Sequence, residues 1–180
     1  MRVISGRLGG RQLLAPKGWQ VRPTPERVRE AIFSALGDLT GMRVLDLYCG
    51  TGALGIEAIS RGAGSGVLVD RDVRPALGNV HNLGLESEIE LIRAEATDWI
   101  RSAPDLEFDL IFLDPPYRQA REIATRLDPE IGRILAPGGR VVTESDRRSP
   151  LEFPSLENVR ERQYGRVMVT FHRVPVPPEK

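Results

Sequence analysis

Short β-rich runs alternate with helical segments from Arg43 onwards, and this alternation limits the possible folds more than any other feature of the chain. The runs expected to be strands are Arg43–Tyr48, Gly66–Val69, Ile89–Ile92, Phe108–Leu113 and Arg140–Thr143. The intervening segments with helical spacing are Ala53–Arg61, Val73–Leu83, Ala96–Arg101 and Glu122–Leu135. Strands that are apolar on both faces and separated by helices predict a parallel sheet covered on each side. Right-handed crossovers make such a sheet doubly wound.

The C-terminal part of the chain departs from this alternation. Val159–Tyr164 and Val167–Val174 are separated only by a turn at Gly165, which leaves no room for a crossover helix. They are therefore predicted to form an antiparallel hairpin at the edge of the sheet. Residues 175–180 include three prolines and are predicted to be a disordered tail.

The N-terminal part carries an extension of its own. Val3–Ser5 and Gln12–Ala15 flank a Gly- and Arg-rich stretch and predict a small hairpin. Thr24 is expected to cap a helix over Pro25–Leu36. The fold class expected is α/β, with a hairpin-plus-helix extension, a Rossmann-like sheet domain and a tail over residues 1–40, 41–174 and 175–180.

The charges cancel over the whole chain but not along it. Twenty-five basic and 25 acidic residues give a formal net charge of zero, yet residues 1–30 hold seven basic and two acidic side chains. A basic segment joined to an acidic remainder is expected when one face meets a polyanion. A merely solvated N-terminal segment explains the same charges. On the first interpretation, phosphate contacts come from Arg7, Arg11, Arg22, Arg27 and Arg29, of which the last two can instead pair with neighbouring acids.

Composition and cysteine use indicate a globular protein of the cytoplasm. The chain is 41% hydrophobic and 28% charged, and its aliphatic runs are too short to cross a membrane. The first residues lack the apolar stretch of a secretory signal, and the single cysteine, Cys49, cannot form an internal disulfide. No cluster of His and Cys has metal-ligand spacing, so no metal is expected.

A glycine-rich turn follows the first strand of the sheet domain. Gly50, Gly52 and Gly55 match the GxGxxG pattern, in which the backbone approaches a ligand and helix N-terminal amides face it. A tight strand-to-helix turn requires glycine even without a ligand, so the pattern alone is weak. Asp46, at the carboxyl end of the strand, favours the cationic amino-acid part of S-adenosylmethionine, because a carboxylate there would repel a pyrophosphate.

Two further acids follow the next two strands. Asp70 ends the second strand, where a carboxylate can accept both ribose hydroxyls of either a nicotinamide or an adenosyl cofactor. The alternative role for Asp70 is a helix N-cap, which Asp72 could fill instead. Glu95 and the amide of Ala96 follow the third strand and could bind the adenine edge, although a carboxylate in the first turn of a helix explains Glu95 equally well.

The sequence Asp114-Pro115-Pro116-Tyr117 distinguishes between these possibilities. Two prolines remove two backbone donors and fix φ, so that rigid carbonyls face outward. Asp114 and the Pro115 carbonyl can each accept a hydrogen bond from an exocyclic NH₂ group, while the Tyr117 ring can stack on a flipped base. A plain turn that closes a strand would need neither the acid nor the aromatic ring.

Together, Asp46–Gly55 and Asp114–Tyr117 make the chain resemble the class I S-adenosylmethionine-dependent methyltransferases that act on exocyclic amino groups. The sequences Arg2-Val3-Ile4-Ser5-Gly6, Gly10-Arg11, Arg22-Pro23-Thr24 and Glu26-Arg27-Val28-Arg29-Glu30 are similar to those of the RsmD family. These bacterial enzymes methylate a guanine of small-subunit (16S) ribosomal RNA at N2. The resemblance extends from Arg2 to about Val174.

The resemblance implies a seven-stranded sheet, S-adenosylmethionine as cofactor, and ribosomal RNA in an assembled or partly assembled 30S particle as substrate. The cofactor contacts it implies are Asp46, Tyr48, Gly50, Thr51, Gly52, Asp70, Arg71, Glu95 and Ala96. The catalytic residues it implies are Asp114, Pro115, Pro116 and Tyr117. We expect the protein to act as a monomer.

The reaction expected is direct methyl transfer to a guanine N2, with Asp114 orienting the amino group and stabilising the positive charge that develops on it. Whether Asp114 also takes the proton is left open by the sequence, as is the identity of the guanine. Two other activities fit parts of the pattern. One is methylation of another base amino group, such as adenine N6 in DNA or another RNA. The other is a nicotinamide-dependent oxidoreductase, for which no hydride-transfer region is found; a non-catalytic RNA-binding protein is a third alternative.

Overall fold

The computed structural model describes residues 1–15, 24–105 and 107–175. The chain forms two compact units, Met1–Glu95 and Ala96–Lys180. Each unit contributes a group of strands with helices packed against them, and the described residues hold seven strands in all. The α/β class expected from the alternating pattern is therefore confirmed.

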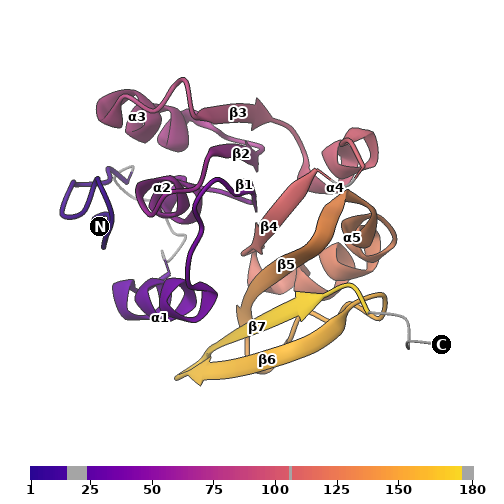
Figure 1. Cartoon of the computed structure of the whole chain (residues 1–180). Coiled ribbons are helices and arrows are strands. Elements are labelled where there is room, and N and C mark those ends of the chain that lie inside the picture. The colour runs from indigo at the N-terminus through magenta and orange to yellow at the C-terminus, as the bar shows by residue number, and fades with distance from the viewer. Residues whose placement is uncertain (16–23, 106, 176–180) are drawn as a thin grey trace. The chain divides into compact units, whose positions relative to one another are not determined.

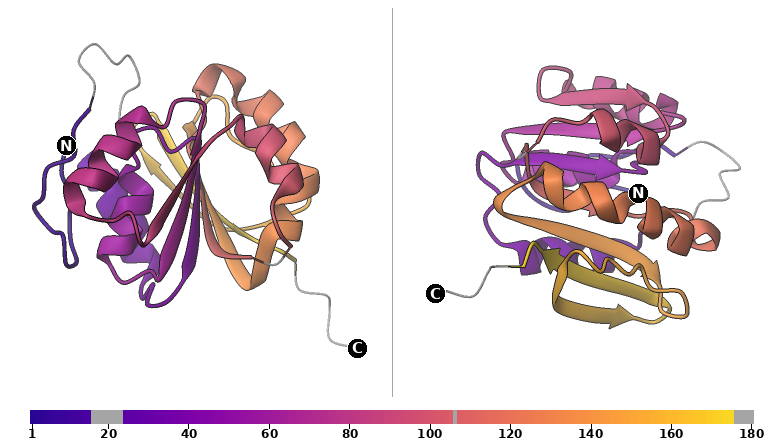
Figure 2. Two further views of the ribbon diagram at one scale, coloured as in Figure 1. Left: turned by 90° about the horizontal axis from the view of Figure 1, so that it is seen from above. Right: turned by 90° about the vertical axis from the view of Figure 1, so that its right-hand side faces the viewer.

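The first unit contains a parallel sheet of three strands. Strands β1 (Arg43–Leu47), β2 (Ser65–Asp70) and β3 (Ile89–Arg93) lie in the order β3-β2-β1 (Figure 1). Helix α2 (Ala53–Ser60) connects β1 to β2 and helix α3 (Arg74–Leu83) connects β2 to β3, and both lie on the same side of these strands (Figure 2). Because the three strands are parallel, their carboxyl ends and the loops that follow them lie at the same end of the strands.

Helix α1 (Glu26–Leu36) precedes the sheet and begins one residue later than expected. Pro25, with φ −54° and ψ 143°, is the N-cap residue, and its carbonyl accepts the amides of Val28 and Arg29. The prediction that Thr24 caps this helix is wrong, because the extended ψ of Pro25 places the boundary after the proline and no side chain caps the helix.

The second unit contains a mixed group of four strands. Strands β4 (Phe108–Leu113), β5 (Leu135–Asp146), β6 (Glu157–Tyr164) and β7 (Val167–Arg173) lie in the order β4-β5-β7-β6. Strand β5 is parallel to β4 and antiparallel to β7, which pairs with β6. The terminal antiparallel hairpin is thus confirmed, while β5 is three times the length expected.

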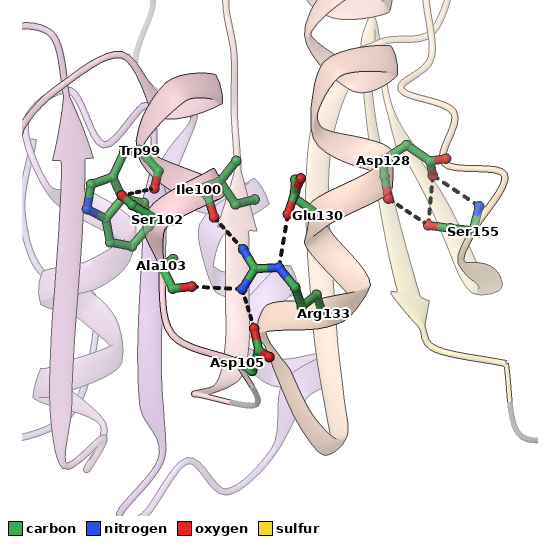
Figure 3. A network of polar contacts seen from close by, with 9 residues as sticks. All are labelled: Trp99, Ile100, Ser102, Ala103, Asp105, Asp128, Glu130, Arg133 and Ser155. Atoms are coloured by element: carbon green, nitrogen blue, oxygen red, sulfur yellow. Dashed lines mark hydrogen bonds and ion pairs between the residues drawn. The ribbon is translucent and has the colours of Figure 1, made fainter.

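Helices of the second unit are tied to the segment that leads into β4. Helix α4 (Ala96–Trp99) continues as a 3₁₀ turn, η1 (Ile100–Ser102), and a second 3₁₀ turn, η2 (Tyr117–Gln119), precedes helix α5 (Ala120–Ile134). The guanidinium of Arg133, in the last turn of α5, donates to the carbonyls of Ile100 and Ala103, each at 2.8 Å, and also pairs with Asp105 and Glu130 (Figure 3). One side chain thereby satisfies two backbone carbonyls of the turn that precedes β4.

The N-terminal residues form a closed loop on the first unit. Arg2 and Gln12 form an antiparallel bridge, and Val3 exchanges backbone hydrogen bonds with Gly10 and Arg11. The expected hairpin is therefore present as antiparallel backbone pairing, although no strand longer than one bridge forms. We call residues 1–15 the N-terminal segment.

Two residues of α2 hold this segment. The fully buried carboxylate of Glu57 accepts the backbone amides of Ile4 at 2.7 Å and Ser5 at 3.0 Å. The Ser60 hydroxyl donates to the Ser5 carbonyl at 2.5 Å and accepts the Leu8 amide at 3.0 Å. The segment is therefore fixed to α2 of the first unit by hydrogen bonds to buried groups, which are costly to leave unsatisfied.

Gly6 packs so closely on α2 that a side chain at this position would clash with the helix. A Cβ atom at Gly6 would lie 1.9 Å from the carbonyl oxygen of Ser60, and the φ of Gly6 is +80°. We expect Gly6→Ala to lower the free energy of unfolding by roughly 2–4 kcal/mol, or to release the segment, because strain of about 1–2 kcal/mol adds to a clash with backbone. Gly10→Ala is the matched control: its φ is +83°, but nothing lies within 4 Å of the added Cβ. Urea unfolding that shows equal losses for the two variants would contradict the close packing at Gly6.

No helix in the described part of the chain combines the length and apolar character needed to span a bilayer.

Candidate active site

Asp46 lies at the carboxyl end of β1 with almost no exposure to solvent. The residue is only 2% exposed. Its Oδ2 accepts a hydrogen bond from the backbone amide of Gly55, in the first turn of α2, at 3.0 Å. Burial raises the pKa of Asp46 to about 7. The hydrogen bond from Gly55 acts in the opposite direction, while the negative charge of Asp70 raises the pKa further. A carboxylate held this far from water is strongly stabilised by a cation that binds beside it.

The loop after β1 is built from residues with positive φ. Tyr48 has φ 63°, an uncommon conformation for an aromatic residue, and Gly50 and Gly52 have φ 56° and 77°. Gly52 is the N-cap residue of α2, and a Cβ there would lie 2.9 Å from Cδ2 of Leu68. Glycine at position 52 is therefore favoured by the turn itself, and this turn, residues 46–55, is called the cofactor loop below after the role that the sequence predicts for it.

Asp70, at the end of β2, holds the cofactor loop from the side. Its Oδ2 accepts the amide of Gly50 at 2.9 Å, and its Oδ1 accepts the amide of Asp72 at 3.0 Å. Asp70 is not the cap of α3: Asp72 accepts the amide of Arg74, the first residue of that helix, at 3.2 Å. The N-cap residue of α3 is Val73 and no side chain caps the helix, so neither Asp70 nor Asp72 is its N-cap.

The residue that ends this unit, Glu95, joins two side chains expected at the cofactor. Its Oε1 accepts the Tyr48 hydroxyl at 3.4 Å, and its Oε2 pairs with Nε of Arg71. Tyr48, Arg71 and Glu95 therefore gather at the carboxyl ends of β1, β2 and β3. Ala96, 2% exposed, begins α4 in the second unit.

The second unit carries the Asp-Pro-Pro-Tyr turn, Asp114–Tyr117, directly after β4. Asp114 is half-buried, Pro115 is buried, and Tyr117 is 39% exposed at the start of η2. The Tyr117 hydroxyl donates to Oε1 of Glu144 at 3.2 Å. Burial and then the negative charges of Glu144 and Asp114 raise the pKa of Tyr117 well above its ordinary value, so Tyr117 is a neutral phenol that presents part of its ring to solvent.

Glu144 is a residue of this site that the sequence did not reveal. It lies near the end of β5 with 4% exposure, and the register that pairs Leu113 of β4 with Thr143 of β5 places it beside the start of the Asp-Pro-Pro-Tyr turn. Parallel neighbours in register direct their side chains to the same face. An acidic residue at the carboxyl end of a buried strand was the available signal, but β5 was expected to end before it.

The arginines expected to bind RNA occupy different environments. Arg11 and Arg27 are exposed, and Arg7 is exposed but pairs with Glu88, its Nη2 lying 2.5 Å from one carboxylate oxygen. Arg22 lies outside the described residues. Arg29 is fully buried, so the prediction that it contacts RNA phosphates is wrong.

Burial gives Arg29 a structural role instead. Its Nη2 donates to the carbonyl of Arg2 at 2.6 Å, and burial lowers its pKa although Glu57 and Glu26 act in the opposite direction. The position follows from helical spacing, since residue 29 shares the inner face of α1 with Val28 and Ile32.

Cys49, inside the cofactor loop, is buried, and burial raises the pKa of its thiol well above the ordinary value. The thiol is therefore protonated at neutral pH and unsuited to act as a nucleophile. Within the described ranges, no group of three or more His, Cys, Asp or Glu side chains could hold a metal ion.

The sequence of this chain is similar to those of known proteins over most of its length. A family model described as "Conserved hypothetical protein 95" matches residues 1–173. A Bacillus subtilis (strain 168) protein described as "Putative rRNA methyltransferase YlbH" is 37% identical, over 96% of this chain and 98% of that protein. A "Ribosomal RNA small subunit methyltransferase D" of Haemophilus influenzae is 32% identical, over 86% of this chain and 83% of that protein.

Solved structures agree in fold. "Putative methyltransferase yhhF from Escherichia coli" aligns with a TM-score of 0.81 at 27% identity, over 97% of each chain. An RNA methyltransferase from Salinibacter ruber, in complex with S-adenosyl-L-homocysteine, aligns with a TM-score of 0.65 at 20% identity, over 88% of this chain and 98% of that chain. The expected Rossmann-like methyltransferase fold is thereby confirmed.

Proposed function

Because this chain belongs to the family of the Conserved hypothetical protein 95 model, the RsmD family of S-adenosylmethionine-dependent methyltransferases, we propose that it methylates the exocyclic N2 of a guanine in 16S ribosomal RNA. The observation that carries the proposal furthest is the joint presence of a buried acid, Asp46, at the cofactor loop and an amino-acceptor turn at Asp114–Tyr117. The proposed substrate form is RNA in an assembled or partly assembled 30S particle, in the cytoplasm.

The residues of the first unit suit S-adenosylmethionine. Asp46 supplies a poorly hydrated carboxylate for an ammonium group, and the close approach of Leu68 to Gly52 leaves room for backbone alone in the loop. Asp70 would accept the ribose hydroxyls, while Tyr48, Arg71 and Glu95 would border the adenosine. When bound, S-adenosylmethionine supplies an electrophilic methyl group on a sulfonium.

Residues of the second unit suit a base with an amino group. The carboxylate of Asp114 and the carbonyl of Pro115 would each accept one N–H of the guanine NH₂, which directs the nitrogen lone pair outward. The Tyr117 ring, held by Glu144, offers a stacking face that does not ionise at neutral pH. Asp114 would also stabilise positive charge as it develops on the nitrogen.

Mapping the methylated nucleotide tests this function most directly. Small-subunit RNA from cells with and without the gene, and from cells rescued with it, is digested and analysed by mass spectrometry. We expect one N2-methylguanine to depend on the gene. A gene-dependent N6-methyladenine would instead support the other base-amino methyltransferases, and a thermal shift with NAD but none with S-adenosylhomocysteine would support an oxidoreductase.

Charge reversal at Arg7 and Arg11 tests the proposed RNA contacts of the N-terminal segment. Because each phosphate contact contributes roughly 0.7–0.9 to the slope of log affinity against log salt, we expect the double variant Arg7→Glu/Arg11→Glu to bind substrate RNA more weakly and with a slope smaller by about 1–2. Arg162→Glu, on the exposed face of β6, is the control. A slope that changes equally in both proteins would refute the assignment of the contacts to this segment.

A further inference from the structure

Asn79 is a buried asparagine within a helix. Neither its burial nor its position in a helix is expected unless its amide has specific hydrogen-bond partners. It lies in α3 with 1% exposure. Asparagine is a poor helix former, and a buried amide destabilises the fold unless its hydrogen bonds are made. An apolar residue would serve better at this position if packing were its only role.

The amide of Asn79 joins two segments that are far apart in sequence. Its Nδ2 donates to the carbonyl of Thr51, in the cofactor loop, at 2.9 Å. The same Nδ2 donates to the carbonyl of Leu14 at 3.0 Å, and its Oδ1 accepts the Leu14 amide at 2.7 Å. One side chain therefore binds both backbone groups of a residue near the end of the N-terminal segment, and a backbone carbonyl of the cofactor loop.

The other anchors of the segment lie elsewhere on the unit. Glu57 and Ser60 bind residues 4–8 at the C-terminal half of α2, whereas the cofactor loop leads into the first turn of that helix. Ser60 and Asn79 thus both hold the segment, but only the contact at Asn79 includes the cofactor loop. This difference allows the two roles, docking the segment and linking it to the loop, to be separated by substitution.

We propose that Asn79 is a positioning residue that couples the N-terminal segment to the cofactor loop, so that RNA on the segment and S-adenosylmethionine in the loop bind cooperatively. The inference rests on the proposed function, in which Arg7 and Arg11 contact RNA. RNA that restrains the segment also restrains Leu14, and Leu14 fixes the amide that holds the Thr51 carbonyl. Such coupling is reciprocal: the factor by which RNA tightens cofactor binding equals that by which cofactor tightens RNA binding.

The test is a thermodynamic cycle with S-adenosylhomocysteine, titrated calorimetrically into the full chain, free and saturated with small-subunit ribosomal RNA. We expect the wild-type protein to bind S-adenosylhomocysteine about tenfold more tightly in the presence of RNA. In Asn79→Ala the ratio falls below about twofold, and affinity in the free protein also falls. Ser60→Ala, which loosens the segment without touching the loop, keeps most of the wild-type ratio.

A second variant approaches the same link from the segment. Leu14→Pro removes the amide that Asn79 Oδ1 accepts but leaves the bond from Asn79 to Thr51. We expect free-protein affinity within about twofold of wild type, with the coupling ratio reduced to less than about threefold. It remains informative if Asn79→Ala does not fold, which thermal melts of each variant establish. In turnover with saturating RNA, Asn79→Ala should raise the KM for S-adenosylmethionine several-fold while kcat changes little.

Three results would overturn the proposal: no effect of RNA on wild-type affinity, a wild-type ratio retained in Asn79→Ala or Leu14→Pro, or equal losses in Asn79→Ala and Ser60→Ala. Failure of the proposed function is a separate result, because it appears as absence of methyl transfer to ribosomal RNA by the wild-type protein. A protein that methylates the RNA without coupling refutes the role of Asn79 alone.

Discussion

Replacing Asp114 with alanine is expected to lower kcat by roughly 10²–10³-fold while the affinity for S-adenosylhomocysteine stays within about twofold. The lone pair of a guanine N2 is delocalised into the ring, so the nitrogen must be oriented by acceptors and stabilised as it gains positive charge. Asp114 is half-buried at the end of β4, in the unit that does not carry the cofactor loop. Its loss should therefore remove catalysis and spare cofactor binding.

Single-turnover methylation and calorimetry measure the two effects separately. Asp114→Asn keeps one acceptor oxygen but lacks the negative charge, so it should retain more activity than alanine and less than wild type. Glu161→Ala, an exposed carboxylate on β6 of the same unit, is the control and should behave as wild type. Full turnover in Asp114→Ala, or loss of S-adenosylhomocysteine binding in it, would exclude the assigned role.

Asp46→Asn is expected to have two large and opposite effects. Affinity for S-adenosylmethionine should fall by roughly 30–150-fold, the equivalent of about 2–3 kcal/mol for a hydrogen bond to a charged group. The ligand-free protein should become more stable at pH 8, because the wild-type fold must there hold a buried carboxylate. The asparagine oxygen can still accept the Gly55 amide, so the local turn is preserved.

The direction of the pH effect follows from the raised pKa of Asp46. The pKa increases from an ordinary 3.8 to about 7 in the folded protein, so the folded state binds the proton more strongly than the unfolded state. The contribution of this group to stability is complete below about pH 4 and is lost as pH rises through about 7, by on the order of a few kcal/mol. Urea unfolding from pH 5 to pH 8 should therefore show wild type losing stability relative to Asp46→Asn. Parallel curves for the two proteins would contradict a buried, proton-binding Asp46.

Local patterns were sufficient to predict most of the elements. Phe108–Leu113 was predicted to the residue, because six residues of strand character end at an acid followed by two prolines. Strand β5, by contrast, runs over Leu135–Asp146 although only Arg140–Thr143 was expected. Its first half contains Ala-Pro-Gly-Gly, which locally favours a loop, and pairing of Leu135 with Phe108 of β4 overrides that preference.

The candidate site was predictable where a strand end alone determines the position of a residue. Asp46 and Asp70 were placed correctly at the ends of β1 and β2 for this reason. Asn79 and Glu144 were missed because the groups they contact lie 65 and 27 residues away in sequence, and only the folded chain brings them together. Arg29 was assigned to the surface from its charge, although the spacing of α1 already placed it inward.

The thiol of Cys49 can serve as a built-in chemical probe of conformational opening. It is the only cysteine of the chain, and it is shielded from solvent in the middle of the loop expected to hold the cofactor. A thiol-specific reagent can label it only when this loop or the whole unit opens, so the labelling rate measures the population of open molecules. The native chain therefore allows the exchange dynamics of the loop to be followed without an introduced label, and the protection conferred by each ligand to be compared on one atom.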